Sequence, residues 1–203
     1  SLDADSFTVS RLEALLVSVR ALNREAVQSM YAGLSEELQL LAQHEAGFQL
    51  SLFQFAIPDD VLSLHPLVGI SPDAVYATAM AQPFQGRLLS DWADNLEADR
   101  MARISNTVRQ GFLLGDTHEQ IARKVRGHAN RGYQDGALQM SRTNAGSIAK
   151  TAVGHLASTA RKSFADANDD ILKGKQWLST LDNRTSKDCR IRDRLKYTLD
   201  NKP

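Results

Sequence analysis

The sequence predicts a mainly α fold: an elongated bundle of long helices followed by a small C-terminal α+β module of strand, helical turn and strand. Two observations support this prediction. Up to Ala167, apolar residues recur at intervals of three and four, which is the period of an amphipathic helix. From Gly174 onward, short alternating segments and turn-forming residues replace that period.

The composition is that of a globular protein. Of the 203 residues, 42% are apolar and the formal charges balance, which distinguishes the chain from disordered sequences. No apolar run approaches the about 20 residues of a membrane-spanning helix, so we expect no membrane contact. Cys189 is the only cysteine, which excludes an intrachain disulfide. No glycine-rich phosphate loop is present, and we expect no cofactor.

The balanced total charge conceals two halves of opposite sign. Residues 1–100 hold 5 lysines and arginines against 14 aspartates and glutamates, whereas residues 101–203 hold 19 against 10. The halves therefore carry −9 and +9. Such asymmetry is typical of halves or subunits that face each other, and of a basic half that faces nucleic acid.

The first 56 residues predict two helices. An apolar face begins near Ser6, and Gly33 is expected to interrupt it, because Ser35 followed by two glutamates is a typical helix start. The second helix then runs to about Ala56. The apolar face comprises Leu12, Leu15, Leu16, Val19, Leu22, Met30, Leu34, Leu38 and Leu41.

Proline-containing loop sequence follows, and Ser71 with a proline after it predicts the start of a short helix that Pro83 ends. From Phe84 the helical period resumes and predicts a long helix that ends within residues 111–115. Its inward stripe is Leu88, Trp92, Leu96, Met101, Ile104, Val108 and Phe112, with Trp92 as a core anchor.

Thr117 and Gln120 form a capping-box pattern that predicts a short helix with Ile121 and Val125 facing inward. A glycine-containing turn region separates it from a last long helix, expected over residues 133–167. Small residues along that helix suit close helix packing or a subunit contact. Its stripe is Leu138, Ala145, Ile148, Ala152, Leu156, Ala160 and Phe164.

The C-terminal module, which we call the knuckle (residues 171–203), is expected to contain two strands. They are predicted at residues 176–180 and 196–199, with a turn at Asp182 and a helical turn capped by Thr185 between them. Its expected core is Trp177, Leu178, Ile191, Tyr197 and Leu199.

The knuckle sequence WLSTLDNRTSKDC resembles the signature of the Mu F-like head morphogenesis proteins, the minor head proteins of tailed bacteriophages. The tetrapeptide at residues 141–144 also resembles the start of the helix that leads into this signature, so the resemblance covers residues 138–200. The signature residues are Trp177, Thr180, Asp182, Arg184, Thr185 and Cys189.

The resemblance implies a structural, non-enzymatic virion protein, located at the portal vertex in the capsid interior after assembly in the host cytoplasm. It implies a role in head assembly and in genome packaging or ejection. The implied partners are the portal protein, other head proteins and further copies of the chain. Three regions are expected: an acidic helical region (1–115), a basic helical region (116–170) and the knuckle (171–203).

The knuckle departs from the family at its metal-binding positions. Many relatives carry a second cysteine where Ser186 stands, and further cysteines and a histidine later in the chain. Cys189 alone cannot supply the four ligands, or three plus water, that zinc requires. We therefore expect no metal within this chain, although residues beyond Pro203 would complete a site if the chain is a fragment.

Contact with DNA is one alternative, in which the protein is a virion component that is ejected with the genome. The basic half motivates it, because lysine and arginine bind phosphates. The candidates for DNA or partner contact are Arg123, Lys124, Arg126, Arg131, Arg190, Arg192 and Arg194.

An effector or enzyme domain fused to a head-morphogenesis module is the other alternative. Cys189 would need a base to act as a nucleophile, but all five histidines lie at or before His155, which we interpret as a helix-surface or core-edge residue. The acidic residues Asp182, Asp188 and Asp193 alternate with basic ones, a pattern that indicates a salt-bridged surface. No catalytic residue is predicted.

Overall fold

The structure is a computed structural model that describes the backbone of residues 2–200 and, within the first helix, the side chains of residue 10 and from residue 13 onward. Helices make up 70% of it, and the longest are α1 (Leu2–Ala56) and α6 (Gln139–Ala167). The only sheet among the described residues is a two-stranded antiparallel one. The predicted mainly α class with a small β element is confirmed.

Contacts within the chain define two compact units, which are described separately. Unit 1 comprises residues 1–38 and 80–154, and unit 2 comprises residues 39–79 and 155–203. Each unit therefore takes one part of α1 and one part of α6. The three-part division expected from composition stays a prediction.

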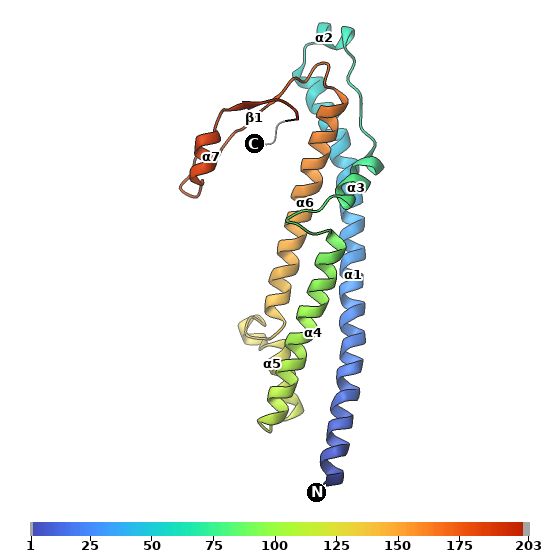
Figure 1. Cartoon of the computed structure of the whole chain (residues 1–203), viewed down its shortest axis with the longest axis vertical. Helices are drawn as coiled ribbons and strands as arrows, with labels where there is room; N and C mark the ends of the chain where they lie inside the picture. The colour runs from blue at the N-terminus through green and yellow to red at the C-terminus, as the bar shows by residue number, and fades with distance from the viewer. Residues whose placement is uncertain (1, 201–203) are drawn as a thin grey trace. The chain divides into compact units, whose positions relative to one another are not determined.

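In unit 1, the helices α4 (Leu89–Leu113) and α5 (His118–Arg126) pack together as a hairpin (Figure 1). Close packing at their junction requires a glycine, because a Cβ atom on Gly111 would lie 2.6 Å from the Cγ1 atom of Ile121. A short 3-10 helix, η1 (Ala129–Arg131), then leads toward α6.

The predicted capping box at the start of α5 is confirmed. The backbone N–H of Gln120 donates to Thr117 Oγ1 at 3.3 Å, and the backbone N–H of Thr117 donates to Gln120 Oε1 at 2.7 Å. Two backbone donors at the helix start are thus paired. The start predicted for α3 (Pro72–Ala81) is also confirmed, with Ser71 Oγ accepting a hydrogen bond from Ala74 N–H at 3.4 Å.

In unit 2, the end of α1 packs against the end of α6, where the rings of Phe53 and Phe164 stack with centroids 5.1 Å apart. The chain between them includes a short helix, α2 (Asp59–Leu64), within the segment expected to be a loop. Asn168 is fully buried and binds both backbone polar groups of Val68. The end of α6 therefore fixes the segment that precedes α3.

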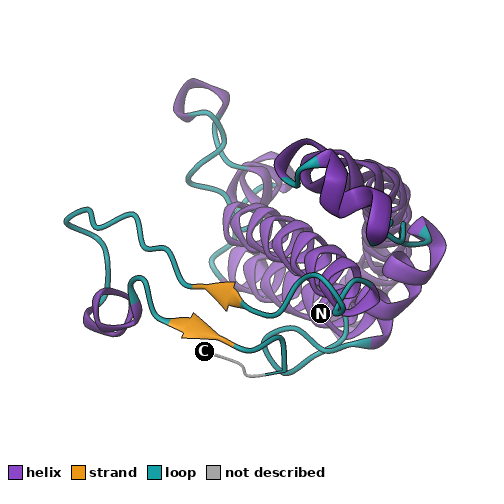
Figure 2. Ribbon diagram, turned by 90° about the horizontal axis from the view of Figure 1, so that it is seen from above, coloured by secondary structure: helices purple, strands orange, loops and turns teal. Residues whose placement is uncertain are grey.

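The knuckle contains the strands β1 (Lys175–Gln176) and β2 (Lys196–Tyr197), with α7 (Lys187–Arg192) between them. The strands pair antiparallel, with Lys175 opposite Tyr197. Figure 2 shows this ribbon of two short strands, with α7 at the far end of the connecting loop. The order of strand, helical turn and strand agrees with the prediction.

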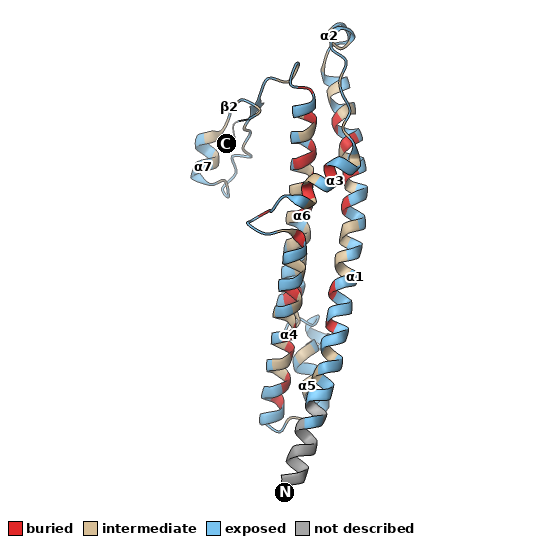
Figure 3. Cartoon of the chain, turned by 45° about the vertical axis from the view of Figure 1, so that its right-hand side comes forward, coloured by how far each residue is buried: buried red, intermediate tan, exposed pale blue. Residues whose placement is uncertain are grey.

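The core lies along the helices, as the buried positions in Figure 3 show. The stripes predicted on α4 and α6 supply eight of the sixteen buried apolar residues that the structure describes, whereas Phe112 at the end of the α4 stripe is exposed. His155 lies at the core edge as predicted, with Nε2 3.0 Å from the carbonyl oxygen of Ala79. The buried stripe residues are Leu96, Met101, Ile104 and Val108 on α4, and Ala152, Leu156, Ala160 and Phe164 on α6.

The expected helix break at Gly33 is wrong, because α1 continues through this residue. The Ser35 hydroxyl donates to the carbonyl oxygen of Tyr31 at 2.9 Å and does not cap a new helix. A glycine inside a helix costs only about 1 kcal/mol relative to alanine. Burial of Leu38 further along the same helix offsets this cost.

Two helix starts also differ from the expectation. Helix α1 begins at Leu2 rather than near Ser6, and the side chain of Leu12 lies outside the described residues. Helix α6 begins at Gln139, six residues after the expected start, because Tyr133 has a φ of 60° that an α-helix does not accommodate.

Two expectations for the knuckle are wrong. Ser186 caps α7 in place of Thr185, since its Oγ accepts a hydrogen bond from Cys189 N–H at 3.2 Å. Leu178 and Ile191 are not core residues, because they are 76% and 73% exposed. Leu178 lies beyond the end of β1 and Ile191 lies on the short helix α7, so neither belongs to a sheet face that could be buried.

Within residues 2–200, the structure contains no helix whose length and apolarity would let it cross a bilayer.

Candidate functional site

Two of the signature residues, Trp177 and Cys189, are joined by hydrogen bonds to Ser179. Trp177 Nε1 donates to Ser179 Oγ at 3.0 Å, and Ser179 Oγ donates to the carbonyl oxygen of Cys189 at 2.7 Å. The backbone N–H of Ser179 donates to Asp193 Oδ1 at 2.8 Å. Ser179 therefore links the strand side of the knuckle to α7. The sequence did not predict this role for Ser179. The only feature that pointed to it is the position of a hydroxyl side chain two residues after Trp177.

Asp182 organises the turn between the first strand and α7. Its Oδ1 accepts hydrogen bonds from Arg184 N–H at 2.9 Å and from Thr185 Oγ1 at 3.0 Å. Its carbonyl oxygen accepts a third from Arg190 Nη2 at 3.1 Å. The signature residues Asp182, Arg184 and Thr185 thus hold one loop conformation, whereas Thr180 is exposed. This is the geometry of an Asx-turn.

Cys189 is a free, half-buried thiol on α7. Its backbone N–H is used by the cap at Ser186. Within residues 2–200, no group of three or more histidine, cysteine, aspartate or glutamate side chains could hold a metal ion. In the described part of the knuckle, the signature residues serve to hold the loop.

Most of the knuckle's aliphatic side chains face solvent. Leu178 and Ile191 are the most exposed, and Leu181 and Leu195 are exposed as well. The ring of Trp177 is half-buried, with the guanidinium carbon of Arg192 5.9 Å from its centroid. Exposed apolar side chains on a rigidly bonded loop are typical of a protein-binding surface.

The basic residues predicted to contact DNA or a partner lie in both units, those of α5 and η1 in unit 1 and the others in the knuckle. Four of them pair with carboxylates, which reduces the positive charge available to phosphates. The pairs are Arg123–Glu119 (3.3 Å), Lys124–Asp116, Arg131–Asp135 (3.4 Å) and Arg194–Asp193 (3.7 Å). Their predicted role stays a prediction.

Asp135 makes two contacts with His128 in the turn after α5. Its Oδ1 accepts a hydrogen bond from the backbone N–H of His128 at 2.8 Å, and its Oδ2 lies 2.8 Å from the Nδ1 atom of the same histidine. The backbone bond from His128 is the main cause that lowers the pKa of Asp135. The ionised carboxylate therefore stabilises this turn.

A groove of about 1080 Å³ lies in unit 1 between α1, α4 and α5. We call it the unit 1 groove. It is wider than most small-ligand sites, which measure about 300–1,000 Å³. Apolar side chains from all three helices line it, among them Leu15, Leu22, Ile104, Val108, Ile121 and Val125. The leucine face predicted on α1 is thus only partly buried, because Leu15 and Leu22 are exposed at this groove.

Two polar atoms at the unit 1 groove are buried without a partner. Asn23 is only 3% exposed, and its Nδ2 donates to the carbonyl oxygen of Glu97 at 3.1 Å. Its Oδ1 and the Nε of Arg100 have no hydrogen-bond partner among the described residues. A buried polar group without a partner costs about 1–3 kcal/mol, so these two atoms lower the stability of the groove wall.

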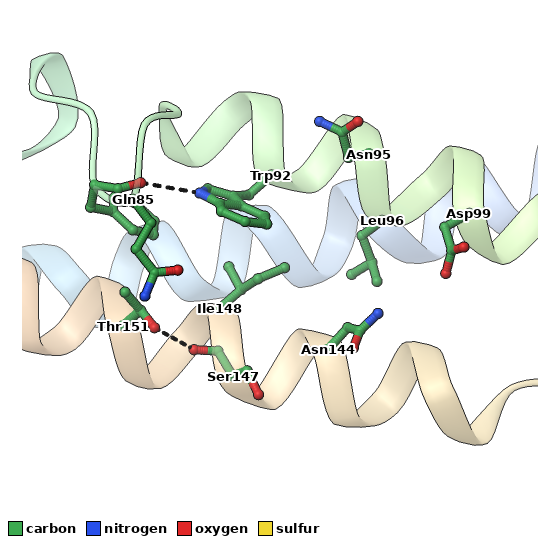
Figure 4. A pocket seen from close by; sticks show the side chains of 10 residues that line it. Gln85, Trp92, Asn95, Leu96, Asp99, Asn144, Ser147, Ile148 and Thr151 are labelled. Carbon is green, nitrogen blue, oxygen red and sulfur yellow. Dashed lines mark hydrogen bonds between the residues drawn. The ribbon is translucent and has the colours of Figure 1, made fainter.

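A second, smaller pocket of about 320 Å³ lies in unit 1 beside Trp92 (Figure 4). Trp92 Nε1 donates to the carbonyl oxygen of Phe84 at 3.4 Å, and the two rings stack with centroids 6.4 Å apart. Opposite them, Thr151 Oγ1 donates to the carbonyl oxygen of Ser147 at 2.8 Å, within α6. Trp92, expected as a core anchor, is therefore a half-buried wall of this pocket.

Comparison of the chain with protein-family models, with curated proteins and with solved structures finds no match. Two features of the chain itself bear on function. The knuckle has a rigid loop with exposed apolar side chains, and the unit 1 groove combines an apolar lining with unpaired polar atoms.

Proposed function

We propose that the protein is a structural minor head protein of a tailed bacteriophage, associated with the portal inside the capsid. In this role it acts in head assembly and in genome packaging or ejection, and it works by binding other proteins. The proposal combines the resemblance of the knuckle sequence to the head-morphogenesis signature with the way those residues are used in the fold.

The observation that carries the proposal is a pair of neighbouring hydrogen-bonded clusters in the knuckle. Ser179 bonds to Trp177 and Cys189 in one, and Asp182 bonds to Thr185 in the other. The signature residues belong to one local structure, as expected if the signature encodes a structural module. The side chains of Trp177, Asp182 and Thr185 are hydrogen-bonded within the knuckle.

The exposed side chains of the knuckle supply the chemistry for partner binding. Leu178 and Ile191 together present two large aliphatic groups to solvent. Burying one such side chain contributes about 1.5–3 kcal/mol. A partner that covers both would therefore gain a substantial part of the affinity of a typical protein complex.

Co-sedimentation with the portal protein tests the proposal. The full chain is produced together with the portal protein of the same phage, and the mixture is separated on a density gradient. We expect the chain to migrate with portal or capsid particles. In the double variant Leu178→Ser/Ile191→Ser, we expect the dissociation constant to rise at least tenfold, which corresponds to about 1.4 kcal/mol and lowers the bound fraction.

The matched control is Leu64→Ser on α2, since Leu64 is a comparably exposed leucine outside the knuckle. We expect this variant to co-sediment like the unmodified chain. Recovery of the unmodified chain only in unassembled fractions would contradict the proposal.

The two alternatives stay predictions with tests of their own. Retention of the full chain on duplex DNA that weakens steeply with salt would support DNA contact. Catalytic turnover that is abolished by Asp182→Ala or Cys189→Ala would support a fused effector domain.

A further inference from the structure

The part of α1 in unit 2 carries apolar side chains on two faces. One face is buried in unit 2, with Ala42 and Ala46 in the core and Phe53 stacked on α6. A second row of side chains on the same helix is exposed. We call this row the α1 stripe; it comprises Leu40, His44, Phe48, Leu52 and Phe55.

The members of the α1 stripe lie on one side of the helix, because they are spaced by four, four, four and three residues. Phe55 is 92% exposed, and the rings of His44 and Phe48 stack at 5.9 Å between centroids. A surface helix normally presents polar residues on its outer face. An exposed row of aromatic and aliphatic side chains therefore indicates a face that another molecule covers.

The unit 1 groove has a lining that suits an apolar helix such as the α1 stripe. Its apolar lining fits the apolar face of a helix, which is a common mode of peptide recognition. Arg100 is a cationic residue in the lining of the groove, and no carboxylate among the described residues forms an ion pair with it. The ligand should thus be an apolar helix that carries a carboxylate at one end.

The α1 stripe meets these requirements in length and in charge. Arg100 to Phe112 along α4 spans about 18 Å, and Leu40 to Phe55 spans about 22 Å, at about 1.5 Å per helical residue. The exposed carboxylate of Asp59 follows the stripe in the chain and forms no ion pair with a described residue. Pairing of Asp59 with Arg100 would orient the stripe antiparallel to α4.

We propose that the unit 1 groove of one copy of this protein binds the α1 stripe of a second copy. The contact joins two different surfaces, so each bound copy leaves its own groove and stripe available to further copies. Association is then head to tail and gives chains or a closed ring. This inference rests on the proposed assembly role. It adds to that role by naming a second copy of the chain as a partner.

The first experiment compares the purified full chain with two variants by sedimentation velocity over a range of concentrations. The groove variant is Leu15→Glu/Leu22→Glu, and the stripe variant is Phe48→Glu/Phe55→Glu. Leu22 is 64% exposed, so these changes do not disturb the core. We expect the unmodified chain to form dimers and larger species, and each variant to dissociate with a constant roughly thirtyfold higher or more, as for hot-spot residues.

The second experiment mixes the two variants in equal amounts. The groove variant retains an intact stripe, and the stripe variant retains an intact groove, so we expect a heterodimer that grows no further. Leu113→Glu and Leu64→Glu are the controls, because these exposed leucines lie outside both surfaces. We expect each control to associate like the unmodified chain.

Three results would overturn the inference: an unmodified chain that stays monomeric at every concentration, variants that associate as it does, or a mixture that stays monomeric. Circular dichroism and thermal unfolding establish that both variants are folded. These experiments contain no portal protein and no other head protein. A negative result would therefore leave the portal co-sedimentation test unaffected. Conversely, loss of portal binding would leave this self-association unaffected.

Discussion

Replacement of Asn168 by alanine should destabilise unit 2 strongly. The Asn168 side chain is fully buried and makes three hydrogen bonds. Its Oδ1 accepts from Val68 N–H at 2.7 Å, and its Nδ2 donates to the carbonyl oxygens of Val68 at 3.0 Å and Phe164 at 2.8 Å. One side chain thus connects the end of α6 to the segment before α3.

The size of the effect follows from these contacts. Each hydrogen bond contributes about 0.5–1.5 kcal/mol net, and a buried group left without a partner costs about 1–3 kcal/mol. The backbone of Val68 is only partly buried, so water can reach part of what the mutation exposes. We therefore expect the free energy of unfolding to fall by about 2–4 kcal/mol.

Urea denaturation followed by circular dichroism measures the decrease in the free energy of unfolding, and limited proteolysis shows which segment is destabilised. We expect faster cleavage within residues 65–71, which Asn168 holds in place. The control is Asn106→Ala on α4, where the side chain is exposed and a change within about 0.5 kcal/mol is expected. Equal stability of Asn168→Ala and the unmodified chain would refute the assigned role of these bonds.

Three further predictions concern other local structures. Gly136→Ala places a Cβ atom against the backbone of the preceding turn and should lower the free energy of unfolding by about 1–3 kcal/mol; an unchanged urea midpoint would contradict this. Asp135→Asn removes a carboxylate whose pKa is lowered chiefly by the backbone N–H of His128. The contribution of a carboxylate with a lowered pKa is present above its unfolded pKa and is lost as the pH falls through the folded pKa. The unmodified chain should therefore be more stable than Asp135→Asn at pH 7, and the difference should shrink below about pH 4; a pH-independent difference would contradict this. Ser179→Ala removes the bond from Trp177 Nε1 and the bond to the opposite side of the knuckle; hydrogen exchange should become faster in the knuckle alone, and unchanged exchange there would exclude the linking role.

Helix positions and starts were predictable where the signal is local. The capping box at Thr117 and Gln120 depends on residues three apart, and the structure contains both of its hydrogen bonds. The stripe that ends at Phe164 was predictable because burial follows the helical period. Local chemistry and periodicity were sufficient for these elements.

Other features depend on groups distant in sequence. Ser35 has the chemistry of a cap, but it bonds to Tyr31 because α1 is stabilised by packing on both sides of Gly33. Leu178 alternates like a core strand residue, yet β1 ends at Gln176 and Leu178 follows it with its side chain exposed.

The polar atoms of the unit 1 groove could not be predicted either. The Nδ2 atom of Asn23 donates to the carbonyl oxygen of Glu97, which is 74 residues away in sequence, and the Oδ1 atom of the same side chain has no partner among the described residues. The Nε of Arg100 is buried on α4 at a groove whose other walls come from α1 and α5. Sequence periodicity placed Leu15 and Leu22 on an apolar face, but only the packing of these helices leaves that face open.

A cryo-EM reconstruction of the intact virion around its portal tests most directly whether this chain is a minor head protein. We predict density for several copies of the chain at the portal vertex inside the capsid, with the exposed leucine and isoleucine of the knuckle against a neighbouring protein. Purified, infectious particles that contain no copy of the chain, by reconstruction and by mass spectrometry, would contradict the proposed function.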